Sequence, residues 1–193
     1  MSMGTEPEVL VLKDAAAWRI WLDEHEDSHD GVWLILAKKG TTSPTSLSYA
    51  QALDEALCSG WIDGQRRSYD EVSYLQRFTP RRARSIWSKR NVEYIQRLRE
   101  AGRMRPRGEH EVSRAQADGR WDRAYEGPAT AVVPEDLRTA LDSYGLVAYF
   151  ESLNSQERYS LLHPLMTATS DKTRAARLQR IVDRLREASA SGG

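Results

Sequence analysis

The residues best suited to chemistry are one aspartate and a set of arginines in the second quarter of the chain. Asp63 stands in the sequence GWIDG, and the segment from Arg66 to Arg107 carries 13 Lys and Arg against 4 acidic residues, a formal charge of +9. Guanidinium groups fork onto carboxylates and phosphates and stack on aromatic rings. Aromatic residues are interleaved with these arginines: Tyr69, Tyr74, Phe78, Trp87 and Tyr94. The pattern favours recognition of an anionic group.

The candidate ligand-binding residues all lie in or beside the first part of this basic segment. They are Trp61, Asp63, Arg66, Arg67, Arg77, Arg81, Arg82, Ser85, Trp87, Ser88 and Asn91. On a regular strand, Asp63 and Arg67 fall on one face, where the guanidinium would keep the carboxylate ionised. We therefore favour a binding protein over an enzyme. In the enzyme alternative, Asp63 is the catalytic candidate, a general acid or base acting on an anionic small molecule.

A structural alternative stays open beside these two. Residues 1–65 carry a charge of −7 and residues 108–193 a charge of −2, so the net charge of zero hides an uneven distribution. Arginines of the basic segment could pair with the acidic flanks, or form a core polar network with Asp63 and Asn91 while the function lies elsewhere.

Cysteine, histidine and hydropathy patterns narrow the class of protein. Cys58 is the one cysteine and the four histidines have no metal-site spacing, so we expect no metal and no cofactor. The apolar runs are too short to span a membrane, and the first residues lack the features of a secretion signal. We therefore expect a cytoplasmic protein without a membrane span, and residues 1–9 as a loose leader.

Several elements are expected to position the candidate residues. Asp14 and Ser48 are placed as N-caps of two helices, the second with Gln51 as a capping box and Gly60 just past its end. VWLILAK predicts a central strand, and WIDGQRRSYD with VSYLQRFTP predicts a hairpin that turns at Asp70 and Glu71.

The hairpin is expected to lead into another helix, with Ser85 or Ser88 as its N-cap. Free amides, the helix dipole and the side chains of Arg81 and Arg82 would then make the helix start an anion site. The last third of the sequence predicts helices only, with an interruption at His163 and Pro164 and a long amphipathic helix from Ser170.

These elements predict an α+β fold, a small antiparallel sheet of about three strands covered by helices. We expect residues 1–127 to form the α+β core, and residues 128–193 to form a helical subregion packed on the same domain.

The chain resembles the YdeI/OmpD-associated family, also labelled bacteriocin-protection proteins. The resemblance is carried by ALC-x-GWIDG at Ala56–Gly64, by FTPR-x3-S-x-WS-x2-N from Phe78 to Asn91, by Gly102-x-Met104 and by Thr173-Arg174. One departure is Ala168-Thr169, where family members usually have Ala-Lys, so no role of that lysine is carried over to this chain. The resemblance implies protection against antimicrobial peptides or association with an outer-membrane porin, and it assigns no particular reaction.

Together the residues and the resemblance predict a protection or resistance protein, with a stress-response role, that recognises an anionic ligand. An anionic small molecule or a peptide is the favoured partner. Nucleic acid is less favoured because the flanks are acidic and the pI is near 6.9. The sequence leaves the oligomeric state and the identity of the ligand open.

Overall fold

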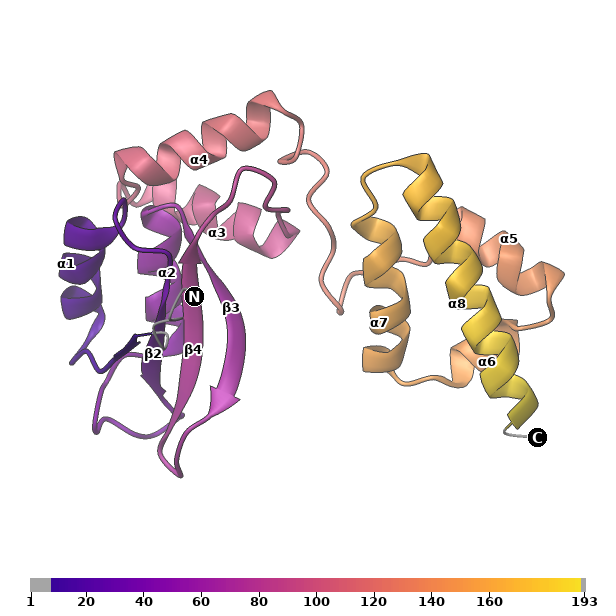
Figure 1. Ribbon diagram of the computed structural model, residues 1–193, viewed down its shortest axis with the longest axis horizontal. Coiled ribbons are helices and arrows are strands. Elements are labelled where there is room, and N and C mark those ends of the chain that lie inside the picture. Colours follow the sequence, from indigo (N-terminus) through magenta and orange to yellow (C-terminus); the bar gives the residue numbers. More distant parts are fainter. Residues whose placement is uncertain (1–7, 192–193) are drawn as a thin grey trace, which may run out of the picture. The chain divides into compact units, whose positions relative to one another are not determined.

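The computed structural model describes residues 8–191, which fold as two compact units. The first unit contains the residues up to Ser85 together with Asn91–Asp122, and the second contains Ile86–Arg90 with the residues from Arg123 onward. Within the described residues there are four strands and eight helices, so the predicted α+β class is confirmed (Figure 1).

A mixed four-stranded sheet forms the centre of the first unit. Its order is β1 (Val9–Leu10), β2 (Val32–Ala37), β4 (Ser73–Pro80), β3 (Trp61–Ser68). β2 pairs with β4 and β4 with β3 in antiparallel fashion, as expected, whereas β1 pairs in parallel with β2. The expected leader therefore contributes a strand at Val9, and its residues 1–7 lie outside the described residues.

Two helices cover one face of this sheet. α1 (Ala15–His25) begins after Asp14, whose carboxylate accepts a 3.0 Å hydrogen bond from the amide of Ala17. α2 (Tyr49–Cys58) begins at the Ser48–Gln51 capping box, as predicted. The ring of Trp18 lies 5.8 Å from that of Phe78 on β4, and Trp18 has no exposed surface. Aromatic packing therefore attaches α1 to the sheet.

The remaining helices of the first unit follow the hairpin. α3 (Lys89–Glu100) begins in the short segment assigned to the second unit, and α4 (Pro106–Ala117) starts with proline at its first position. Ile95 and Leu98 of α3 and Val112 of α4 are fully buried. Ser88 directly precedes α3, so Ser88 rather than Ser85 stands at the N-cap position.

The second unit is a cluster of four helices, α5 (Glu135–Ser143), α6 (Val147–Ser152), α7 (Ser155–Met166) and α8 (Asp171–Ser191). They share a core of their own, made of Leu137, Leu141, Leu146, Phe150, Leu161, Leu162, Leu165, Ile181, Val182 and Leu185. α7 runs through Pro164, so the interruption predicted there is wrong. Whether this unit packs on the first stays a prediction.

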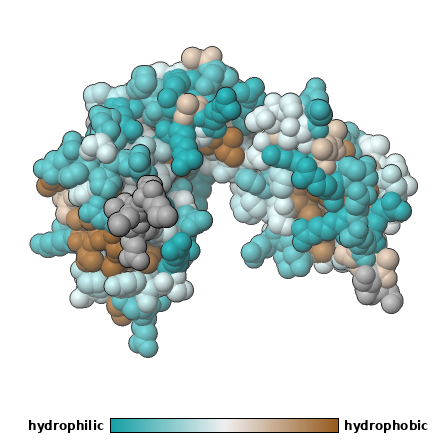
Figure 2. Space-filling view, viewed as in Figure 1, coloured by the Kyte–Doolittle hydropathy of each residue, from teal (hydrophilic) through white to brown (hydrophobic). Residues whose placement is uncertain are grey.

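Surface polarity is as expected from the composition. Hydrophilic side chains cover most of the visible surface, and apolar ones appear in limited patches (Figure 2). Among residues 8–191, no helix combines the length and the hydropathy that crossing a membrane requires.

Candidate functional site

A bulge in β3 decides which candidate residues share a face of the sheet. Asp63 pairs with Phe78, but Arg66 pairs with Gln76 and Arg67 with Leu75, so the register shifts between Asp63 and Arg66. The side chain of Gln76, which is 3% exposed, donates to the carbonyl oxygens of Gly64 and Gln65 at 3.0 and 3.2 Å. These bonds hold the irregular backbone in place.

The predicted pairing of Asp63 with Arg67 is therefore wrong. Strict alternation places both on one face, whereas the extra residue of the bulge turns Asp63 toward the face of Phe78 and Arg67 toward the face of Leu75. Asp63 accepts a 2.8 Å hydrogen bond from the hydroxyl of Tyr49 on α2 instead.

Two candidate arginines meet a tryptophan that was not among the candidates, on the face of the sheet opposite Phe78. Trp33 of β2 pairs directly with Arg77 of β4. The guanidinium carbon of Arg67 lies 4.5 Å from the centre of the Trp33 ring, and that of Arg77 lies 5.9 Å from it. Both distances are within the range of cation–π attraction. We call Trp33, Arg67 and Arg77 the Trp33 cluster.

The Trp33 cluster has more positive charge than its neighbours neutralise. Among the described residues, no carboxylate lies within 4.0 Å of either guanidinium, and none accepts a hydrogen bond from the buried Nη1 of Arg77. Burial lowers the pKa of Arg77 from its usual value, while the charge of Asp30 raises it. Trp33 is 4% exposed and Arg77 is half-buried, whereas Arg67 is exposed, so the guanidinium of Arg67 is the group of the cluster that an anion in solution can reach.

Arg66 lies elsewhere on the hairpin. Its guanidinium carbon is 3.9 Å from the centre of the Tyr74 ring, and its pairing with Gln76 puts it on the face opposite the Trp33 cluster. Burial raises the pKa of the Tyr74 hydroxyl, and the charge of Arg66 lowers it. Arg66 therefore does not belong to the Trp33 cluster. Its side chain is exposed, but on the other face of the sheet from that of Arg67, which follows it in β3.

Other candidates have structural positions. Trp61 has no exposed surface and donates from its indole nitrogen to the carbonyl of Glu26 at 3.2 Å. Arg81 is 5% exposed, and its amide donates to the carbonyl of Gly60. Trp87 is 2% exposed and belongs to the second unit. These three side chains contribute little accessible surface to a ligand.

The expected anion site at the helix start is not assembled as the sequence suggested. Arg82 is exposed, but its amide bonds to the hydroxyl of Ser85 in a loop that ends before α3. The amide of Lys89, the first residue of α3, already donates to the carbonyl of Tyr125 at 2.9 Å. Ser88 pairs with Tyr125 in an isolated bridge, and Asn91 lies half-buried within α3.

The second half of the basic segment forms an ion-pair network with the acidic flank. Glu55, 8% exposed, accepts from Arg103 at 2.6 Å and from Arg105 at 2.7 Å. The other pairs are Arg97 and Arg103 with Asp54, Arg105 with Asp23, Arg107 with Asp27, and Arg99 with Glu109. The alternative that the arginines pair with acids within the protein therefore applies to Arg97–Arg107. The acid at the centre of this network is Glu55 and not Asp63.

This network was missed as a set of named partners, although a signal existed. Asp54 and Glu55 follow each other in a helix whose buried stripe includes Leu53 and Ala56, so one acid of the pair had to approach the core. Buried acids need a partner, and the basic segment from Arg66 to Arg107 offers a surplus of guanidinium groups.

Neither a metal centre nor a reactive thiol is built from the described residues. Within residues 8–191, no three His, Cys, Asp or Glu side chains are grouped so as to hold a metal ion. Cys58 is fully buried, and burial raises the pKa of its thiol to about 11. The neighbouring Glu55 raises that pKa further, whereas Arg103 and Arg105 oppose the shift.

Most of the chain matches two protein-family models. Residues 10–111, more than half of the sequence, match the family model described as a domain of unknown function, DUF8412. The chain belongs to this family. Residues 130–188 match a second model, described as Bacteriocin-protection, YdeI or OmpD-Associated, which confirms the resemblance predicted from the sequence. Comparisons with curated proteins and with solved structures found no match.

The two matches divide the predicted features between them. The DUF8412 region contains the Trp33 cluster, the hairpin and the arginine network. The bacteriocin-protection region contains Thr173 and Arg174, whose roles are structural in this fold. Thr173 bonds to the hydroxyl of Ser170 at the start of α8, and Arg174 makes two hydrogen bonds to the carboxylate of Asp136 on α5.

Proposed function

We propose that this protein acts in protection against bacteriocins, as a binding protein that recognises an anionic ligand through the Trp33 cluster. The protective role rests on the match of residues 130–188 to the bacteriocin-protection family. The favoured ligand is an anionic small molecule or an acidic peptide. The expected cytoplasmic location stays a prediction.

One observation carries the proposal. Arg67 and Arg77 both lie over the ring of Trp33, while no carboxylate of the described residues comes within ion-pair distance of them. By contrast, each of the five arginines from Arg97 to Arg107 has an acidic partner. Guanidinium groups fixed on an aromatic ring are already ordered, so an anion that binds them loses less entropy on their side.

The geometry supports binding better than catalysis. Asp63, the acid–base candidate, is held by the Tyr49 hydroxyl on the face opposite Arg67, so the two groups do not act on one substrate. The Trp33 cluster itself contains two guanidinium groups and an indole. These groups can attract an anion and pack against it, but they do not transfer protons near neutral pH.

A thermal-shift screen at low salt tests the proposal. The panel contains phosphorylated metabolites, nucleotides, short oligonucleotides and acidic and antibiotic peptides, because a ligand that binds the folded state raises the melting temperature by mass action. A true ligand should bind at least about tenfold more weakly to Arg67→Gln, which loses one charge-assisted hydrogen bond. Arg84→Gln is the matched control, because Arg84 is also an exposed arginine of this unit.

The outcomes separate the alternatives. A salt-sensitive shift that is lost in Arg67→Gln and kept in Arg84→Gln supports the anion site. Equal loss in both variants would indicate nonspecific attraction to positive charge, and the absence of any shift across the panel would refute the proposal.

A further inference from the structure

A cavity in the second unit is separate from the Trp33 cluster. It has a volume of about 320 Å³, at the lower end of the size range of small-molecule sites. The nine residues that line it come from the segment before α5, from α6 and from α7: Pro128, Ala129, Ala131, Val133, Phe150, Ser155, Arg158, Tyr159 and Leu162. All of them belong to the second unit.

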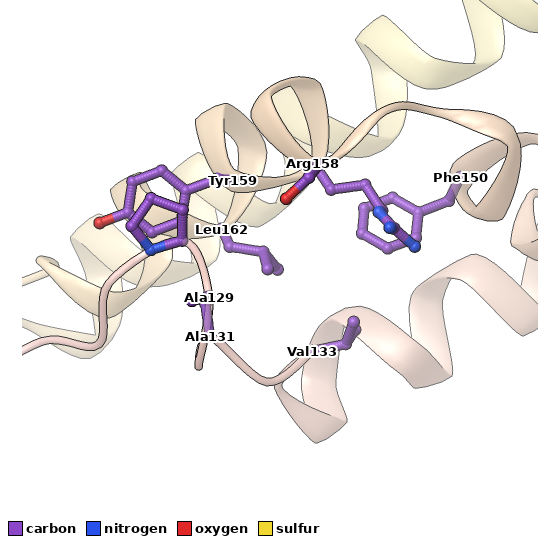
Figure 3. Close-up of a pocket in the computed structure, with 9 residues that line it drawn as sticks. Ala129, Ala131, Val133, Phe150, Arg158, Tyr159 and Leu162 are labelled. Atoms are coloured by element: carbon purple, nitrogen blue, oxygen red, sulfur yellow. The ribbon is translucent and has the colours of Figure 1, made fainter.

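The cavity exists because small side chains face a helix of large ones. Ala129 and Ala131 lie on the connecting segment, across from Leu162 and Tyr159 of α7 (Figure 3). The amide of Ala131 donates to the carbonyl of Gly127 at 3.0 Å, and the hydroxyl of Tyr159 donates to the carbonyl of Glu126 at 3.1 Å. These bonds hold the segment beside α7, and the missing side-chain volume remains as a cavity.

The lining combines an apolar floor with a single charge. Phe150 and Leu162 are 3% and 4% exposed, and both belong to the core of the unit. Arg158 is the one charged residue of the lining. Within residues 8–191, no carboxylate pairs with its guanidinium and no acceptor takes a hydrogen bond from it. The hydroxyl of Tyr159, by contrast, already has an acceptor.

We propose that this cavity binds a small carboxylate with an aromatic or short acyl body. The carboxylate accepts paired hydrogen bonds from Arg158, for which the planar fork of a guanidinium is suited. The apolar body packs against Phe150, Leu162 and Val133, which bury it from water. A single unpaired arginine selects one negative charge, and the small volume excludes long chains. This site is independent of the Trp33 cluster.

Chemical-shift mapping of the full chain with 3-phenylpropionate tests the site. Saturable shifts are expected at Ala131, Val133 and Leu162, with weaker binding of the neutral 3-phenylpropanamide. Arg158→Gln should weaken binding at least about tenfold, because a charge-assisted pair is lost. Arg184→Gln, an exposed arginine of α8 outside the lining, should bind as the wild type does.

A second variant guards against misfolding as an explanation. Ala129→Phe adds a ring at an exposed position that lines the cavity, so it should block binding while the unit stays folded. The proposal is overturned if no saturable shift appears up to about 10 mM ligand, since binding weaker than that is not a specific site. It is also overturned if the amide binds as well as the acid, or if Ala129→Phe binds normally.

Discussion

Cys58 shows how a single residue is excluded from chemistry by its surroundings. Its thiol lies at the end of α2 with no exposed surface, and the carboxylate of Glu55 is close enough to raise its pKa further. The thiolate is the reactive form of cysteine, and a pKa of about 11 leaves almost none of it at neutral pH. The residue therefore acts as a small apolar side chain.

The stability of the protein should depend on this thiol above pH 9. The pKa of Cys58 is raised from 9.0 to about 11, so the unfolded state ionises first as the pH rises. The contribution of the Cys58 thiol to the free energy of unfolding is fully present below pH 9. It falls by at most about 2 to 3 kcal/mol by pH 11. Denaturant unfolding of wild type and Cys58→Ala at several pH values measures it.

The variant provides the control, because other groups that titrate in this range are common to both proteins. The free energy of unfolding of the wild type should fall more steeply than that of Cys58→Ala. Parallel curves, or rapid modification of the native thiol at pH 8, would show that Cys58 is not protected.

At the scale of elements, α2 and α4 approach each other closely at Gly108. A Cβ atom added at Gly108 would lie 2.1 Å from the carbonyl oxygen of Cys58, so only glycine fits there. The same carbonyl accepts a hydrogen bond from the amide of Arg105 at 3.1 Å. This approach brings the side chains of Arg103 and Arg105 to Glu55.

Glu55→Gln should destabilise the protein by about 3 kcal/mol. The substitution leaves two guanidinium groups without their buried carboxylate, a larger loss than the pair itself contributes. Glu109→Gln is the matched control because its pair with Arg99 is more exposed, and it should cost less than about 1 kcal/mol. Equal losses in the two variants, measured by denaturant unfolding, would contradict a central role for Glu55.

In addition to its apolar contacts in the core, α8 is attached to its neighbours through Arg174. The guanidinium donates to both carboxylate oxygens of Asp136 at 2.7 and 2.8 Å and to the carbonyl of Leu165 at 2.8 Å. These bonds join α8 to α5 and α7. The pair lowers the pKa of Asp136 below its ordinary value of 3.8, chiefly through the hydrogen bonds from Arg174.

Asp136→Asn should therefore have a pH-dependent effect. The folded state lowers the pKa of Asp136, so its contribution is present above pH 3.8 and is lost as the pH falls through the lowered value. Because both side chains are about one-third exposed, we expect about 1 kcal/mol near neutral pH. Melting curves of wild type and variant should converge in acid. A difference that is independent of pH would refute this role of the carboxylate.

At the scale of the whole molecule, the uneven charge of the chain has two different uses. The arginines from Arg97 to Arg107 are neutralised within the first unit, mainly by acids of residues 23–55. Arg66, Arg67 and Arg77 contact aromatic rings instead. One basic segment therefore contains arginines that are paired within the fold and arginines that lie on aromatic rings, and only two of the latter, Arg67 and Arg77, belong to the proposed ligand site.

Much of the fold was predictable because local signals and the final structure agree. The Asp14 and Ser48 caps, the β2 strand and the hairpin are specified by neighbouring residues. The sequence could not predict which side chains of β3 lie on which face of the sheet, because the bulge depends on a hydrogen bond from the side chain of Gln76 to the backbone of Gly64. For the same reason Trp33 was absent from the candidate site, since its approach to Arg67 crosses the intervening strand.

The central claim is tested most directly by titrating the full chain with inorganic pyrophosphate. The titration is followed by NMR, through the N–H signals of the protein's side chains. We predict saturable shifts of the Trp33 indole and of the Arg67 and Arg77 side chains, weakened by salt and by Arg67→Gln but not by Arg84→Gln. Shifts confined to other arginines, or none up to about 10 mM, would contradict an anion site at the Trp33 cluster.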